Sequence, residues 1–131
     1  MRLRVIDFTS AELNEIELEE IDDLKKYKET ETVSWINIDG LSDLNKIERI
    51  GKIFELHPLL MEDLVNTTQR PKIEEYDNCL FIVIKMLRYD DAKEMIVAEQ
   101  LSLVVGKNYL LSFQERVGDV FEPVRERIRK H

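Results

Sequence analysis

The chain has 131 residues, of which 44% are hydrophobic and 35% are charged, a composition typical of a single soluble globular domain. Its 27 acidic residues outnumber its 19 basic ones. The resulting net charge of −8 argues against a nucleic-acid partner, which needs clustered cations. The longest apolar runs have about five residues, whereas a membrane-spanning helix needs about 20. The single cysteine, Cys79, cannot form an intrachain disulfide, and we interpret the chain as cytosolic.

The first half of the chain predicts strands followed by two helices. In chain order the expected elements are a strand over residues 1–8, a short exposed strand over 16–18, a short helix over 21–28, a strand over 33–40, a helix from a Ser42 cap to Phe54, and a helix over 57–66. In the first of the two long helices, Leu44, Ile47 and Ile50 recur at helical spacing. Gly51 lets another element approach this helix closely. Pro58 suits the first turn of the second helix.

Four strands and a last helix are expected in the second half. They are strands over 72–76, 79–89, 95–105 and 108–114, and a helix that starts at Asp119 and has Val120, Val124 and Ile128 on its inner face. Every residue of 80–84 is apolar, which predicts a strand buried on both faces. This order of elements predicts a layered α/β domain with a mixed sheet. One short final helix can hardly cover a wide sheet, so either a partner chain covers it or the sequence is cut from a longer one.

Nucleophilic and zinc chemistry find little support in the sequence. Cys79 begins a buried strand, where a cysteine is usually an inert hydrophobe. His57 precedes a proline at a helix start, which is typical of a turn residue. One cysteine and two distant histidines do not make a zinc site, and no glycine-rich phosphate loop is present. Carboxylates are the abundant ligand type, and most adjacent acid pairs are interpreted as solvated surface.

The helix over 57–66 carries the acid pair that differs from the others. Successive helical residues are rotated by about 100°, which separates two faces. The apolar face holds Leu60, Met61, Leu64 and Val65, and the opposite face holds Glu62, Asp63, Asn66 and Leu59. The second face is either wet surface with a stray leucine or a contact face that also holds a hard cation. Mg²⁺ and Ca²⁺ bind oxygen ligands, and Mg²⁺ takes one or two carboxylates besides water, so two acids on one helix supply half a site.

Seven stretches of the sequence occur in the order of one known family. They are residues 35–40, 53–64, 69–72, 81–87, 99–103, 112–115 and 118–129. Together they resemble the cytoplasmic N-terminal domain of the CorA family of magnesium transporters. The resemblance extends from residue 33 to the end of the chain, and the preceding residues match only in general style.

The resemblance implies an α/β/α sandwich with a mixed parallel and antiparallel sheet, in which helix cover on one face is incomplete. It also implies that residues 1–131 form a single N-terminal cytoplasmic regulatory domain, truncated at its C-terminus and lacking the stalk and membrane helices. The complete transporter would be a homo-pentamer that touches the membrane only through those missing helices. This domain would lie at the cytoplasmic face of the cell membrane. Neither catalytic residues nor a nucleic-acid partner are expected.

The resemblance also implies a metal role for Glu62 and Asp63. Their positions match acids that bind divalent cations between neighbouring cytoplasmic domains. The expected ligand is a regulatory Mg²⁺, which Co²⁺ or Ca²⁺ could replace in vitro. Mg²⁺ bound between protomers would favour the closed pore of a magnesium or cobalt transporter, a population shift by a ligand that prefers one state. The partner acids would lie on a later helix that the chain lacks.

Two other hypotheses remain open from the sequence. A structural oligomerisation module without a metal role predicts association that is indifferent to Mg²⁺. A carboxylate-metal hydrolase predicts inward-facing acids in a deep pocket and turnover of phosphate or sugar esters. The sequence instead places its best acids on an outer helix face.

Overall fold

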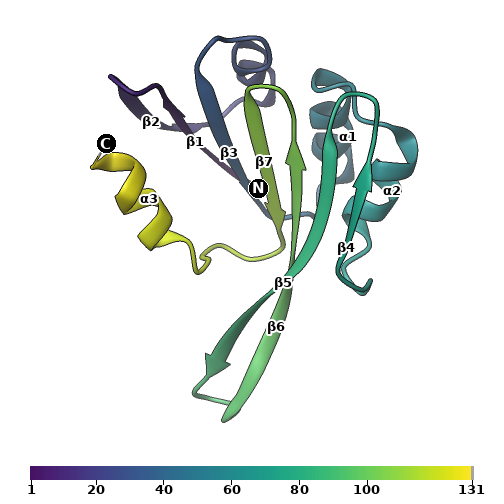
Figure 1. Cartoon of the computed structure of the whole chain (residues 1–131). Coiled ribbons are helices and arrows are strands. Elements are labelled where there is room, and N and C mark those ends of the chain that lie inside the picture. The colour runs from purple at the N-terminus through teal and green to yellow at the C-terminus, as the bar shows by residue number, and fades with distance from the viewer. Residues whose placement is uncertain (131) are drawn as a thin grey trace.

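The chain forms one seven-stranded β-sheet with helices on both of its faces (Figure 1). The computed structural model describes residues 1–130. The strands are β1 (Arg2–Phe8), β2 (Leu13–Leu18), β3 (Val33–Asp39), β4 (Lys72–Glu75), β5 (Leu80–Asp90), β6 (Met95–Val105) and β7 (Tyr109–Gln114). The helices are the 3₁₀ helix η1 (Ile21–Tyr27) and the α-helices α1 (Leu44–Ile53), α2 (Pro58–Val65) and α3 (Glu122–Arg129). Within residues 1–130 no helix has both the length and the apolar character needed to cross a membrane.

The strands follow the order β2-β1-β3-β7-β6-β5-β4 across the sheet. Strands β3 and β7 are parallel, with Ile36 opposite Leu111, and the other neighbouring pairs are antiparallel. A parallel pair needs a long crossover connection, and here α1, α2 and strands β4–β6 lie between the two strands in the chain. The mixed sheet predicted from the sequence is confirmed.

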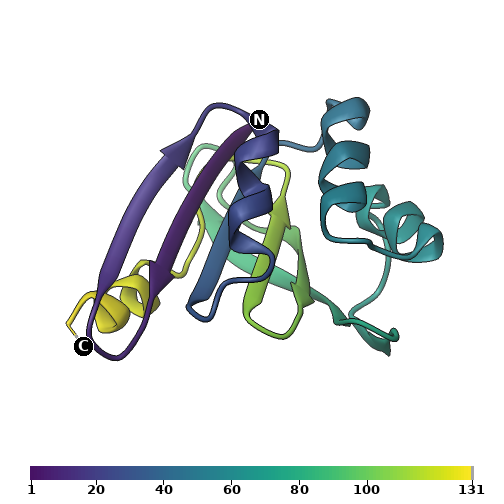
Figure 2. The same ribbon diagram turned by 90° about the horizontal axis from the view of Figure 1, so that it is seen from above.

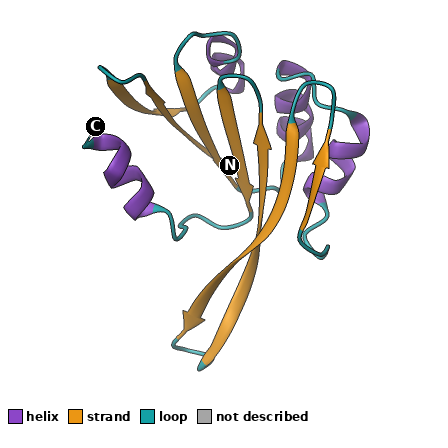
Figure 3. Ribbon diagram, in the orientation of Figure 1, coloured by secondary structure: helices purple, strands orange, loops and turns teal. Residues whose placement is uncertain are grey.

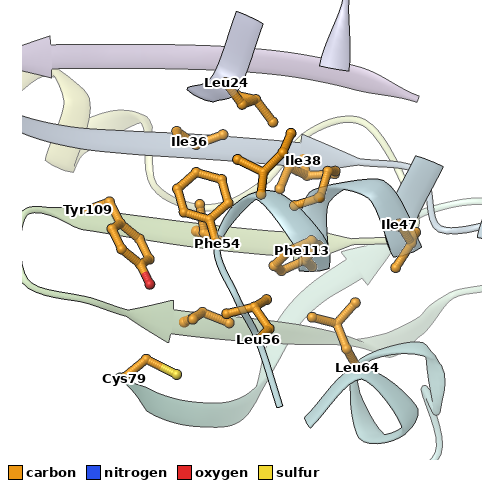
Figure 4. Close-up of a cluster of buried hydrophobic side chains, with 14 of the residues drawn as sticks. Leu24, Ile36, Ile38, Ile47, Phe54, Leu56, Leu64, Cys79, Tyr109 and Phe113 are labelled. Atoms are coloured by element: carbon orange, nitrogen blue, oxygen red, sulfur yellow. The ribbon is translucent and has the colours of Figure 1, made fainter. Parts of the chain in front are cut away.

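The main hydrophobic core lies between the sheet and the layer formed by η1, α1 and α2 (Figure 4). Alternate residues of the central strands face this layer, among them Ile36. Phe54, at the end of α1, is fully buried, and its ring centroid lies 4.7 Å from that of Tyr109. A Cβ on Gly51 would stand 2.6 Å from Met61 Sδ, so this glycine allows α1 and α2 to approach closely, as predicted.

The opposite face of the sheet carries α3, which lies apart from the other helices (Figure 2). Trp35 and Asn37 of β3 alternate with the core residues and contact Arg125 of α3. The strands at the far end of this face lack such cover, and Ile73 of β4 is 68% exposed. The α/β/α sandwich with incomplete cover on one face is therefore confirmed.

The expectation that residues 80–84 are buried on both faces is wrong. Phe81 and Val83 point into the core and are fully buried. The residues between them point to the other face and are only partly buried, because α3 lies over β2, β1 and β3 and does not reach β5 (Figure 2). Beyond the end of β4, strands β5 and β6 continue as a projecting two-stranded ribbon (Figure 3).

The start of α1 differs from the prediction by one residue. Asp43, not Ser42, caps the helix, and its Oδ1 accepts the backbone N–H of Lys46 at 3.2 Å. Leu44, expected on the apolar face, is exposed because it lies in the first turn, outside the core contact.

The last helix differs more from the prediction. It begins at Glu122 rather than Asp119, and Val120 and Val124 are exposed instead of facing inward. The residue that α3 buries is Arg125. The inner side of this helix is therefore mixed. Arg125 is buried beside Asn37 and Trp35, whereas Ile128 is half-buried, as the prediction of an inward position requires.

Candidate functional site

Helix α2 is fixed by its cap and by two buried leucines. His57 Nδ1 accepts the backbone N–H of Leu59 at 3.0 Å, so His57 caps the helix, as expected of a turn residue. Pro58 occupies the first helical turn, where its missing N–H is not needed. Leu60 and Leu64 are fully buried. The opposite side of α2 is thereby directed outward.

Glu62 and Asp63 lie on this outward side, as their spacing predicts. Glu62 is exposed and takes part in no ion pair among residues 1–130. The Asp63 side chain is 33% exposed. Leu59, on the same side, is 59% exposed, so the acidic face also presents one large apolar side chain.

Asp63 is paired with a cation that belongs to the chain. Lys72 of β4 places its Nζ 2.6 Å from Asp63 Oδ2 and 2.6 Å from Glu74 Oε1. The hydrogen bonds to Asp63 and Glu74 raise the pKa of Lys72. The Lys72 ammonium, together with the Tyr76 hydroxyl, lowers the pKa of Glu74. A divalent cation that binds Asp63 must therefore compete with the Lys72 ammonium.

Asn66, expected on the acidic face, instead stabilises the C-terminus of α2. Its Oδ1 accepts the backbone N–H and the hydroxyl of Thr68. Its backbone carbonyl accepts from the side-chain amides of Gln69 and Gln100. Gln69 also donates to the backbone carbonyl of Asp63. These bonds fix the end of the helix and leave the two carboxylates as the ligand groups of the face.

A groove of about 510 Å³ lies between α1 and α2 beside Glu62. Its lining is mainly apolar and includes Met61. Glu48, Glu55 and Glu62 contribute carboxylates to it, and Lys52 contributes an ammonium. Lys28 Nζ lies 2.9 Å from Glu55 Oε2 and Lys52 Nζ lies 3.5 Å from Glu48 Oε1, so Glu62 is the carboxylate of the groove that is left to attract a cation.

The described part of the chain holds no complete metal site. Among residues 1–130, no three or more His, Cys, Asp or Glu side chains are grouped so as to hold a metal ion. In two other acid pairs of the sequence, one carboxylate already has a partner within the chain. Asp22 Oδ1 lies 2.8 Å from Arg49 Nε, and Asp90 Oδ1 accepts backbone N–H groups of its own turn. Glu62 and Asp63 supply two carboxylates, so an ion held there would need further ligands from water or from outside residues 1–130.

Sequence reasoning missed a buried polar cluster beneath α3. Arg125 is only 5% exposed, and it donates to both carboxylate oxygens of Asp119 at 2.8 and 2.6 Å. It also donates to Asn37 Oδ1 at 2.9 Å. Its guanidinium carbon lies 4.6 Å from the centroid of the Trp35 ring, a cation–π contact. The sequence signal was an acidic residue and an arginine six positions apart, which is too common to be specific.

The pKa values of the two carboxyl groups in this cluster are shifted in opposite directions. Burial would raise the pKa of Asp119, but the hydrogen bonds from Arg125 and the backbone outweigh burial and hold it below its usual value. For Asp39, burial dominates and raises the pKa, although Arg4 Nη2 lies 3.6 Å away. The cluster is thus an ion network built into the sheet face and not a second acidic surface.

The mixed sheet, its two helix layers and the outward acid pair define an α/β domain with a candidate cation site on its surface. A family model described as CorA-like Mg²⁺ transporter protein matches residues 30–131. The chain therefore belongs to the CorA-like Mg²⁺ transporter family. The match covers the stretches whose order in the sequence resembles that family.

Individual relatives agree with this family. The chain is 41% identical over 127 residues to the cobalt/magnesium transport protein CorA of Thermotoga maritima, covering 97% of the chain and 36% of that protein. The CorA magnesium transporter of Methanocaldococcus jannaschii matches with a TM-score of 0.63 at 15% identity, covering 98% of the chain and 35% of the transporter. The ZntB cytoplasmic domain of Vibrio parahaemolyticus matches with a TM-score of 0.71 at 10% identity, covering 98% of the chain and 49% of that domain. At such identities the two structural matches establish the fold. The chain spans about a third of the length of the curated relatives it matches.

Proposed function

We propose that the chain is the cytoplasmic Mg²⁺-sensing domain of a CorA-type transporter for divalent cations such as Mg²⁺ or Co²⁺. The observation that supports this proposal is family membership combined with an acid pair on the exposed side of α2. On this proposal residues 1–131 are one regulatory domain of a longer protein that continues into membrane helices. The domain works at the cytoplasmic face of the cell membrane and is not an enzyme.

The regulatory ion binds between copies of the domain. Glu62 and Asp63 provide two carboxylates, and a neighbouring copy or a later segment of the protein, together with water, completes the coordination. Without the ion, the acidic faces of adjacent copies repel each other. With the ion, the closed arrangement of a homo-pentamer is favoured, because Mg²⁺ binds that state more tightly than the open one.

Lys72 sets the concentration at which the ion binds. Its ammonium already pairs with Asp63 and Glu74, so Mg²⁺ must bind against a fixed positive charge. This competition weakens binding, and occupancy then changes at abundant rather than trace levels of the cation. Such a response suits a domain that reports when the cytosol has enough Mg²⁺.

A backbone NMR titration of the chain tests the proposal. Mg²⁺ should shift the amide signals of residues 57–66 beyond the shifts that Na⁺ causes at equal ionic strength. The double variant Glu62→Gln with Asp63→Asn should lose this response. The double variant Asp90→Asn with Asp91→Asn, in the β5–β6 turn, is the matched control, because it changes the net charge by the same amount. Equal responses of the two double variants would contradict the assignment.

The two alternatives from the sequence predict different results. A structural oligomerisation module without a metal role predicts no Mg²⁺-specific shift on α2. A carboxylate-metal hydrolase predicts turnover of phosphate or sugar esters by the pure protein, and the named relatives are transport proteins.

A further inference from the structure

Helix α3 is attached to the sheet with little apolar packing. Within residues 122–129, the buried residue is Arg125, whereas Val124 is exposed. Two hollows lie between α3 and the strands beneath it. One, of about 240 Å³, is bordered by Arg125 and Arg129, and the other, of about 430 Å³, is bordered by Val124 and Ile128.

Two arginines supply the main contacts between α3 and the sheet. Arg129 donates from Nε and from Nη2 to the two carboxylate oxygens of Glu15 on β2, at 2.8 Å in each case. Arg125 donates to Asn37 Oδ1 at 2.9 Å and stacks on the Trp35 ring. The arginine contacts are polar or cation–π interactions, which depend on geometry more than on buried area. One aromatic contact adds to them, because the Phe121 ring lies edge-on to the Trp35 ring with the ring centroids 6.5 Å apart.

The acidic partners of both arginines lie mostly on the same segment as the arginines. Arg125 bonds to Asp119 and Glu122, and Arg129 bonds to Glu122 and Glu126 in addition to Glu15. If the segment left the sheet, each arginine and these carboxylates would enter water together, so no charged group of the segment would stay buried without its partner. The usual large cost of stranding one member of a buried ion pair would therefore not arise.

The charged side chains on the sheet side of the contact also have partners of their own. Arg4 lies 3.6 Å from Asp39 and 3.9 Å from Asp119. Because Asp39 belongs to β3, Arg4 would keep a carboxylate partner after the segment had left. Undocking therefore leaves no unpaired buried charge on either side.

We propose that residues 119–129 form an electrostatic latch, docked on the sheet through Arg125 and Arg129 and released as one unit while the rest of the fold stays intact. An isolated helix as short as α3 is unstable in water, so release also unfolds α3. Release uncovers Trp35 and joins the two hollows into one open surface. The latch is sensitive to salt, because the pair between Arg129 and Glu15 is partly exposed.

The single tryptophan of the chain, Trp35, reports directly on the latch through its quenching by acrylamide. Glu15→Gln removes the ion pair between Arg129 and β2 and leaves the partners of Arg129 within α3. The matched control is Glu17→Gln, because Glu17 lies on the same strand but pairs with Arg2 at 2.8 Å and not with α3. Quenching should show a released fraction about two- to fivefold higher in Glu15→Gln, the effect of losing one partly exposed ion pair. Glu17→Gln should match the unmodified chain.

Salt gives a second readout on the same proteins. Raising KCl from about 0.05 M to 0.5 M should increase Trp35 quenching in the unmodified chain and in Glu17→Gln, because salt screens the exposed pair. Glu15→Gln should respond much less. A Glu15→Gln variant that is quenched no more than Glu17→Gln at low salt would overturn the latch.

Amide hydrogen exchange tests release in the unmodified chain and in one variant. In the unmodified chain, the amides of α3 should exchange faster than those of β3 and should depend only weakly on urea, as expected for local opening. Arg125→Met, which loses the hydrogen bond to Asn37 and the stacking on Trp35, should raise α3 exchange more than about tenfold and leave β3 unchanged. Equal exchange rates and equal urea dependence for α3 and β3 in the unmodified chain would refute the proposal.

Discussion

Replacing Lys72 by methionine should tighten Mg²⁺ binding to the acid pair. The Lys72 ammonium lies 2.6 Å from Asp63 Oδ2. A Mg²⁺–oxygen bond is about 2.1 Å, so an ion bound to that oxygen would stand at most about 4.7 Å from Nζ. The repulsion between a double and a single charge at this distance in water is about 1–2 kcal/mol after screening by salt. Lys72→Met should therefore lower the Kd for Mg²⁺ roughly tenfold.

The assay is an NMR or calorimetric titration of the chain at constant ionic strength. Lys93→Met in the β5–β6 turn is the matched control, because it removes one positive charge far from α2. The Lys93→Met variant should bind Mg²⁺ like the unmodified chain. An equal affinity of the Lys72→Met and Lys93→Met variants would refute the view that Asp63 is a ligand for which Lys72 competes.

Three further predictions concern the fold that carries the site. Phe54→Ala should cost about 3–5 kcal/mol of unfolding free energy in urea denaturation, because its ring is fully buried, and a cost below about 1 kcal/mol would contradict its place in the core. Gly51→Val should lower the free energy of unfolding by about 1–3 kcal/mol, because the new side chain meets Met61. Adding Met61→Ala should restore most of this free energy, and strictly additive losses from the two substitutions would exclude the contact. Burial raises the pKa of Tyr109 to about 12, so its contribution to stability is complete below the unfolded value near pH 10 and is lost as the pH rises toward 12. Ultraviolet absorbance should detect this late ionisation, and titration of Tyr109 near pH 10 in the folded chain would disprove it.

The faces of α2 could be predicted from the sequence because they depend on local periodicity. Leu60 and Leu64 point into the core, and Glu62 points outward, as the helical spacing requires. Cys79 could be predicted in the same way: it is buried at the head of β5, and burial raises the pKa of its thiol, as expected for an unreactive cysteine. A pattern that repeats within one element is visible without knowledge of the fold.

The pairing of Lys72 with Asp63 could not be predicted, although the proposed affinity of the acid pair for a cation depends on it. It depends on how β4 docks beside α2 after the intervening loop. The periodicity of apolar residues within β4 or within α2 does not show how the two elements pack against each other.

The contacts beneath α3 could not be predicted from the sequence for a related reason. Arg125 and Asn37 are 88 positions apart in the chain and meet only because β3 lies beneath the last helix. The rule that apolar residues mark the buried face selected Val120 and Val124, which are exposed. That rule fails where a buried arginine with hydrogen-bond and cation–π partners in the sheet takes the inner position.

Limited proteolysis of the complete transporter that carries this domain tests the central claim most directly. If Glu62 and Asp63 sense Mg²⁺ between copies, Mg²⁺ should protect the assembly from the protease. Glu62→Ala combined with Asp63→Ala should abolish most of that protection. Without Mg²⁺, the double variant should be cleaved no faster than the unmodified protein, because the repulsion between acidic faces is removed. Full Mg²⁺-dependent protection in the double variant would contradict the sensing role of this acid pair.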